Sequence, residues 1–88
     1  MSLLDNIQNY YETLVLESLA KQIIGQEFDE DVLTDVLCIA INHLPPRYIR
    51  HEVDFLYYMS PIERQEIELK AYKAVKDALA FIKNKNRL

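Results

Sequence analysis

The stretch DVLCIAI, which begins at Asp35, constrains the fold of this chain most strongly because nearly all of its residues are apolar. A helix that is apolar around most of its circumference is buried on several sides. Two consecutive prolines, Pro45 and Pro46, disfavour helical geometry in the residue before them, so the helix has to end by Leu44. The sequence therefore predicts a central helix over residues 30–44, with the rest of the chain packed around it.

A first helix is predicted over residues 2–24, where apolar side chains form two adjacent helical rows. Gly25, the only glycine of the chain, is suited to end this helix in a left-handed conformation. The two rows are wider than one intramolecular face requires, which indicates contact with a second subunit. Asp29 is the expected N-cap of the central helix, and Phe28 is placed to pack on Leu33 as a hydrophobic staple.

A third helix is predicted from Ser60 to about residue 84. Ser60 is the expected N-cap, Pro61 is the first helical residue, and Glu63 completes a capping box. The face expected to enter the core consists of Ile67, Ala71, Ala74, Ala78 and Ile82, widened by Tyr72, Val75 and Leu79.

Between the second and third helices, residues 53–59 alternate in a pattern that favours an extended strand, with an irregular turn or a short helix as the alternatives. A strand needs a partner, and no second strand of similar quality is visible in the sequence. The same segment of a two-fold-related subunit is the economical partner. The predicted fold is thus mainly α: a three-helix core with a short extended or β segment between the second and third helices, in a homodimer.

Length and composition indicate a single domain over residues 1–88. A chain of this size buries only about 60% of its unfolded surface, so a monomeric core would be marginal. Cys38 is the only cysteine and lies in the apolar run, so we expect a buried, inert thiol and a reducing compartment. The N-terminus lacks the pattern of a signal peptide and no apolar run is long enough to span a membrane. We therefore expect a cytoplasmic protein without membrane contact.

Charge is unevenly distributed along the chain. Residues 1–44 have a net charge of −7 and residues 45–88 a net charge of +3, which together give −4. The asymmetry indicates that an anionic ligand would meet the second half, although a solvated surface with mutually attracting halves explains it equally well. The acidic total makes nucleic acid an unlikely partner, since such binding draws on a broad cationic face.

The sequence contains no recognisable catalytic or metal-binding motif. A phosphate loop, a nucleophile elbow and a zincin motif are all missing, so we expect neither catalytic residues nor enzymatic activity. No pair of cysteines or histidines has the spacing of a zinc site, and we expect neither metal nor cofactor. His51 beside Glu52 and Asp54 is best interpreted as a surface histidine near solvated acids.

The segment after the two prolines is the most specific candidate for binding. Arg47 and Arg50 follow a stiff backbone and therefore lose less entropy when they engage a phosphate or a guanine edge. Tyr48 offers a face on which a base can stack. On the residues alone, structural salt bridges from the two arginines to Glu52 and Asp54 are the commoner alternative.

The string DVLCIAINHLPPRYIRHEVD, residues 35–54, resembles the signature of the late competence development ComFB-like family. The matching features are the acid Asp35, the triplet that ends at Asn42, the pair Pro45 and Pro46 after a leucine, and Tyr48. Asn9, Glu12, Leu14 and Val15 are similar to the N-terminal helix pattern of the same family. Some members hold zinc with a cysteine cluster before the signature, and this chain keeps only Cys38 there, so zinc is not carried over.

The resemblance implies a small, helical, dimeric bacterial protein without known catalytic activity. Some members bind cyclic dinucleotides, cyclic di-GMP in particular. For this chain it implies that Arg47 and Arg50 meet phosphate or guanine, that Tyr48 or His51 stacks, and that Asp54 accepts from a guanine edge. Asn42 is expected to cap the end of the second helix.

Two alternatives to a ligand-binding module remain open. One is a protein-interaction adaptor without a small-molecule ligand, in which Phe55, Tyr57 and Tyr58 contact an unidentified partner or the twin subunit. The other is an accessory factor for DNA uptake in competence, which predicts salt-dependent DNA binding.

Overall fold

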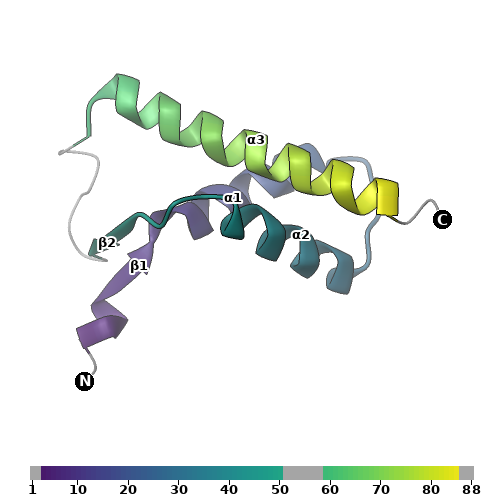
Figure 1. Cartoon of the computed structure of the whole chain (residues 1–88), viewed down its shortest axis with the longest axis horizontal. Coiled ribbons are helices and arrows are strands. Elements are labelled where there is room, and N and C mark those ends of the chain that lie inside the picture. The colour runs from purple at the N-terminus through teal and green to yellow at the C-terminus, as the bar shows by residue number, and fades with distance from the viewer. Residues whose placement is uncertain (1–2, 51–58, 86–88) are drawn as a thin grey trace.

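The computed structural model describes residues 3–50 and 59–85 and consists mainly of helix (Figure 1). The three helices are α1 (Tyr10–Gln22), α2 (Glu30–Asn42) and α3 (Pro61–Lys85). A short 3-10 helix (Leu3–Asn6) and the strand β1 (Ile7–Asn9) precede α1. A second strand, β2 (Tyr48–Arg50), lies between α2 and α3. The predicted fold class, three helices with a short β element between the second and third, is confirmed.

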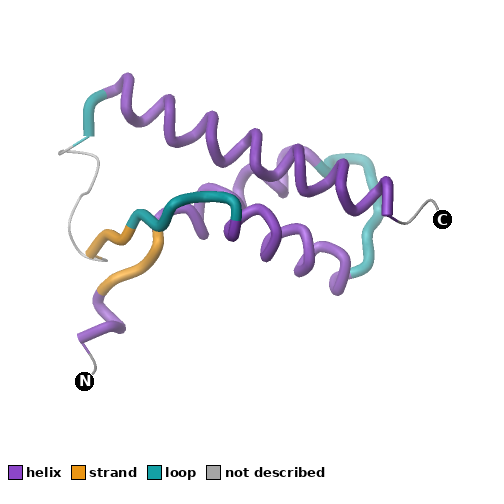
Figure 2. Tube along the Cα trace, viewed as in Figure 1, coloured by secondary structure: helices purple, strands orange, loops and turns teal. Residues whose placement is uncertain are grey.

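Helix α3 runs along most of the length of the molecule, and α1 and α2 pack against it (Figure 1). The chain directions in Figure 1 show that α1 runs parallel to α3 and α2 antiparallel to both. At the C-terminal end of α3, Lys83 Nζ donates a hydrogen bond to Gln26 Oε1 in the loop between α1 and α2 at 3.2 Å. The two-stranded sheet lies at the opposite end, where α1 begins and α2 has already ended (Figure 2).

The core is built around one valine from each helix. Val15 of α1, Val36 of α2 and Val75 of α3 are each 0% exposed. Burial of a side chain of this size contributes about 1.5–3 kcal/mol relative to leaving it in water. Around them pack Tyr11, Leu14, Leu19, Ala40, Met59, Ile67, Ala71, Ala78 and Leu79. The apolar composition of the central helix is therefore matched by two partner helices of the same chain.

The prediction of one helix over residues 2–24 is wrong at its beginning. Asn9 has an extended backbone and its side-chain oxygen accepts from the N–H of Tyr11, so α1 starts at Tyr10. Asparagine is among the most favourable N-cap residues because it satisfies an N–H that a helix start leaves unpaired. Leu3 and Leu4, which continue the apolar rows in the sequence, are 84% and 73% exposed. At the other end, Gly25 does adopt a left-handed conformation, with φ of +80°.

The predicted starts of the other two helices are confirmed. Asp29 is the N-cap of α2 through its backbone, and its side chain makes no capping bond with the part of the chain that the structure describes. Ser60 Oγ accepts from the N–H of Glu63 at 3.1 Å, which is one of the two bonds of a capping box. The return bond from the Ser60 N–H to the Glu63 carboxylate is not found among the described residues, and that carboxylate contacts Arg47 instead. Helix α2 ends at Asn42, two residues before the predicted boundary.

The strand in the structure is not the one predicted. Most of the predicted segment, residues 53–58, lies outside the described residues, whereas β2 covers Tyr48–Arg50. It pairs antiparallel with β1 of the same chain, with Ile7 opposite Arg50 and Asn9 opposite Tyr48. The sequence analysis identified neither of these two short strands. Three-residue strands are too short for an alternating pattern to reveal them.

Two single-residue predictions are also wrong. Cys38 is exposed rather than buried because it lies two positions after Val36 and two before Ala40, on the opposite side of α2 from both. Tyr72, expected to widen the core face of α3, is 47% exposed. None of the helices in the described part of the chain is both long enough and apolar enough for a membrane span.

Candidate ligand-binding site

The loop after α2 returns to the start of α1, where its backbone is anchored. The N–H of Arg47 donates to Asn9 Oδ1 at 2.9 Å, and the carbonyl of Arg47 accepts from the N–H of Tyr10 at 2.6 Å. The next three residues form β2 and pair with β1. The segment after Pro45 and Pro46 is thus held by both side-chain and backbone contacts, in agreement with the expectation of a stiff backbone.

Asn9 is the central residue of this anchor. Its side-chain oxygen accepts two hydrogen bonds, from the N–H of Tyr11 at 3.2 Å and from the N–H of Arg47 at 2.9 Å. It is the one buried polar residue in the described part of the chain, with 9% of its surface exposed. Sequence reasoning missed its contact with Arg47. The signal for its capping role was present, since Glu12 follows three residues later with the spacing of a capping box.

Arg47 forms an ion pair with the first turn of α3. Its Nη2 atom lies 2.6 Å from Glu63 Oε1, and the two side chains are 44% and 40% exposed. A pair this exposed contributes about 0–1 kcal/mol because water screens it. Glu52 and Asp54, the acids suggested by the sequence, lie outside the described residues. Among the described residues, the acid that pairs with Arg47 is Glu63. The pair links the anchored loop to α3, and any anion that binds Arg47 has to compete with this carboxylate.

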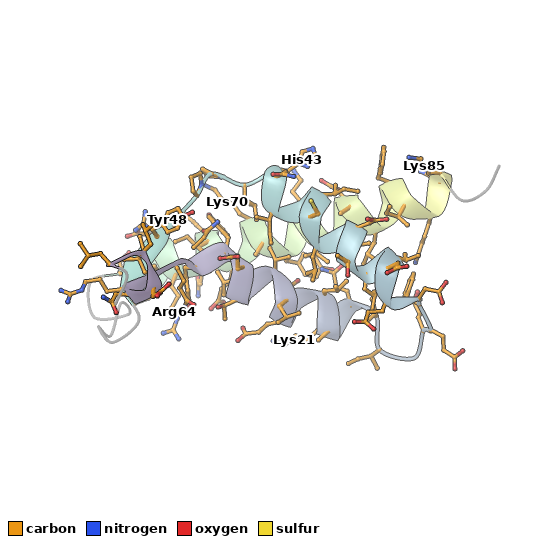
Figure 3. All side chains as sticks on the ribbon, turned by 90° about the horizontal axis from the view of Figure 1, so that it is seen from below. Lys21, His43, Tyr48, Arg64, Lys70 and Lys85 are labelled. Atoms are coloured by element: carbon orange, nitrogen blue, oxygen red, sulfur yellow. The ribbon has the colours of Figure 1, made fainter. Side chains whose placement is uncertain are left out.

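Tyr48 and Arg50 lie on one face of β2. Successive side chains of a strand point to opposite faces, so these two share a side while Ile49 between them is half-buried. Tyr48 is 62% exposed and is labelled in Figure 3. The structure thus brings together an aromatic ring and a guanidinium group on a solvent-facing surface. His51 and Asp54, the other two residues predicted for the site, lie outside the described residues.

The remaining signature residues lie along α2 and its end. Asp35 is exposed on α2. Asn42 is its last residue and donates through Nδ2 to Cys38 Sγ at 3.6 Å, a weak contact. Asn42 was expected to cap the end of α2, but the C-cap in the structure is His43. The Nδ1 atom of His43 lies 2.7 Å from the carbonyl oxygen of Ile39. Pro45 and Pro46 follow and are exposed.

The two tyrosines that follow Asn9 keep their protons more firmly than a tyrosine in water. Burial raises the pKa of Tyr11, and the positive charge of Arg47 lowers it by a smaller amount. Burial also raises the pKa of Tyr10, and the largest opposing effect comes from Arg64. Both hydroxyl groups are therefore neutral at physiological pH and place no negative charge beside Arg47 and Arg64.

Within residues 3–50 and 59–85, no group of three or more His, Cys, Asp and Glu side chains is arranged to hold a metal ion. The described part of the site presents the positive charge of Arg50 and the aromatic ring of Tyr48 to solvent. An arginine and a tyrosine on one side of a short strand are suited to a phosphate and a flat ring.

Comparison with known proteins agrees with the sequence signature. The family model described as late competence development protein ComFB matches residues 8–86. Neither the curated proteins nor the solved structures gave a match. The matched region includes all three helices, both strands except for Ile7, and the whole signature around the two prolines. The chain therefore belongs to the late competence development protein ComFB family.

Proposed function

We propose that this protein is a non-enzymatic regulatory module that binds a cyclic dinucleotide, cyclic di-GMP, through the segment from Pro45 to Asp54. Two copies form the site in a cytoplasmic homodimer. Membership of the ComFB family supports the general role, and the chemistry of the segment supports the choice of ligand.

The observation that carries the proposal is the shared orientation of Tyr48 and Arg50 on an anchored strand. Both side chains are exposed, while their backbone is held by β1 and, just upstream, by Asn9. A binding segment that is ordered in advance loses little conformational entropy when a ligand arrives. Arg50 can then meet a phosphate or a guanine edge, and Tyr48 can stack on a base.

Arg50 carries more of the proposed recognition than Arg47. Arg47 is engaged by Glu63 in the structure, so its contribution to anion binding is reduced by the loss of that ion pair. No ion pair of Arg50 is found with the residues that the structure describes.

A dimer fits the symmetry of the proposed ligand. Cyclic di-GMP has two phosphates and two guanines related by an approximate two-fold axis. Two copies of the same anchored segment, related by a two-fold axis, would present matching groups to both halves.

The experiment is a calorimetric titration of the protein with cyclic di-GMP. Arg50→Ala is expected to weaken binding by about tenfold or more, since a good guanidinium contact to a base contributes about 1–3 kcal/mol. Its melting temperature should stay close to that of the unmodified protein because the side chain is exposed. Lys21→Ala in the last turn of α1 removes one positive charge elsewhere and is expected to bind normally.

Equal affinity of Arg50→Ala and the unmodified protein would reject the role of Arg50. If no cyclic dinucleotide binds the unmodified protein, the proposed ligand itself is rejected.

A second candidate function is that of a protein-interaction adaptor. It is favoured by exposed large apolar side chains, among them Leu16 on α1 at 57% and Leu69 on α3 at 65%. Thermal shift with a panel of nucleotides separates the two candidates, because a ligand that binds only the folded state raises the melting temperature. A panel without any shift would favour the adaptor.

A further inference from the structure

A groove of about 760 Å³ lies between the end of α2 and the middle of α3. Its apolar surface includes Ile39 and Leu44 on one wall, and Ala74 and Phe81 on the other. Phe81 is 55% exposed, so its ring is available to a ligand. Binding sites for small molecules commonly have volumes of about 300–1,000 Å³ and mostly apolar walls with a few polar groups. The groove has the size and the lining of such a site.

Charged side chains of α3 also line the groove. Lys70, Lys73 and Asp77 follow one another at the spacing that places residues on the same side of a helix. In the described part of the chain, none of the three forms an ion pair. His43, which follows α2, also lines the groove, and both His43 and Lys70 are labelled in Figure 3. The groove therefore combines an apolar interior with two cations and one carboxylate.

We propose that this groove binds a guanine nucleotide, with the base between the apolar walls and the phosphate at the lysines. The face of the base packs against Phe81, as bases do on aromatic side chains. The carboxylate of Asp77 accepts from the N1–H and N2–H₂ groups of guanine, a pairing with the Watson–Crick edge that adenine cannot provide. Lys70 and Lys73 meet the phosphate oxygens as charge-assisted donors.

The groove also continues the segment proposed above as the ligand site. Pro45 lines the groove and precedes Arg47 by two residues. A cyclic dinucleotide could therefore place one guanylate half in the groove and the rest along Tyr48 and Arg50 of β2. This inference rests on the proposed function. It adds residues of α3 that line the groove and would select guanine over other bases.

The charges favour a nucleotide over a helix of a second copy as the occupant. An apolar helix seated in the groove would remove Lys70, Lys73 and Asp77 from water without offering them partners, and burial of an unpaired charge is strongly unfavourable. A nucleotide offers each of them a partner of opposite charge or a donor.

The test compares three variants of α3 in titrations with cyclic di-GMP. Lys73→Ala and Asp77→Asn change groove residues, and Lys76→Ala is the matched control because Lys76 is exposed on the same helix and does not line the groove. We expect Lys73→Ala and Asp77→Asn each to weaken binding by about tenfold, the effect of losing one charge-assisted hydrogen bond. Lys76→Ala should bind normally. Asp77→Asn should also reduce the preference for cyclic di-GMP over cyclic di-AMP.

Amide chemical shifts recorded during the same titration give a second readout that does not depend on the variants. The signals of Ala74, Asp77 and Ala78 should move as ligand is added, whereas those of Leu16 and Ser18 on α1 should not. Shifts confined to residues outside the groove would overturn the inference.

The outcomes separate this inference from the proposed function. If Arg50→Ala weakens binding of cyclic di-GMP while Lys73→Ala and Asp77→Asn do not, the groove is rejected and the proposed function stands. If cyclic di-GMP does not bind but GMP or GTP binds in a way that depends on Lys73 and Asp77, the proposed function fails and the groove stands. Absence of binding to all these nucleotides rejects both. A change in self-association of the ligand-free variants, without a change in binding, would assign the groove to contact between copies.

Discussion

Asn9 shows how one side chain can join two distant parts of the chain. Its amide oxygen accepts from Tyr11, two positions away, and from Arg47, 38 positions away. The first contact belongs to a pattern that sequence alone can reveal, because a capping residue and its acid are close together in the chain. The second depends on where the loop after α2 comes to lie, and no local pattern reports that.

We expect Asn9→Ala to destabilise the protein by about 2–3 kcal/mol, because it removes an N-cap and leaves the N–H of Arg47 without its partner. Asn9→Asp, which keeps an accepting oxygen, should lose much less. Urea unfolding measures both. Asn6→Ala is the matched control, since Asn6 is exposed in the short helix just before β1. Similar free energies of unfolding for Asn6→Ala and Asn9→Ala would contradict the role assigned to Asn9.

Arg47 illustrates the limit of sequence reasoning at the candidate site. The sequence identified it as a binding residue or a partner of nearby acids, and the structure pairs it with Glu63, 16 positions later. In the sequence, Glu63 was assigned to the capping of α3. In the structure, its backbone N–H donates to Ser60 and its carboxylate contacts Arg47 of the loop. For Tyr48 and Arg50 the binding role stays a prediction, and the structure shows both side chains exposed on β2.

At the scale of elements, the accuracy of prediction followed the strength of the boundary signals. Helix α3 starts where Ser60 and Pro61 mark it, and α2 is bounded by an acidic N-cap and by prolines. The start of α1 was missed because Leu3, Leu4 and Ile7 continue the apolar spacing of the helix beyond its true beginning. The strands were missed for the opposite reason, since three residues contain too little pattern to be recognised.

Ser60 is expected to matter for more than the first turn of α3. Ser60→Ala should reduce the free energy of unfolding by about 1 kcal/mol through loss of the N-cap. Because that turn also positions Glu63, hydrogen exchange should accelerate at the N-terminus of α3 and at the loop around Arg47. Ser60→Asp retains an accepting side chain and should behave like the unmodified protein. Faster exchange in α3 alone would indicate that the Arg47–Glu63 pair does not couple the two segments.

The whole molecule buries its core without help from a second copy. Three valines from three helices are fully buried, and the short strand finds its partner within the chain. The sequence argument for a dimer, based on an unpartnered strand and a wide apolar face of the first helix, is thereby weakened. The argument that remains is the symmetry of the proposed ligand.

Sedimentation velocity with and without cyclic di-GMP tests the dimer directly. We expect the protein to sediment as a dimer at saturating ligand, because one two-fold ligand is shared by two copies. Association should weaken when ligand is withdrawn, by mass action. A protein that binds the ligand yet remains a monomer at every concentration would require a site within one copy.

The exposed position of Cys38 on α2 has a practical consequence for this question. The chain has one cysteine, so a nitroxide reagent attaches at a single place without any substitution. Each copy would then contain one paramagnetic centre, and a symmetric pair would give a single dipolar distance. Addition of a nucleotide could be followed through that distance in frozen solution, which would report the mutual orientation of two copies before either is crystallised.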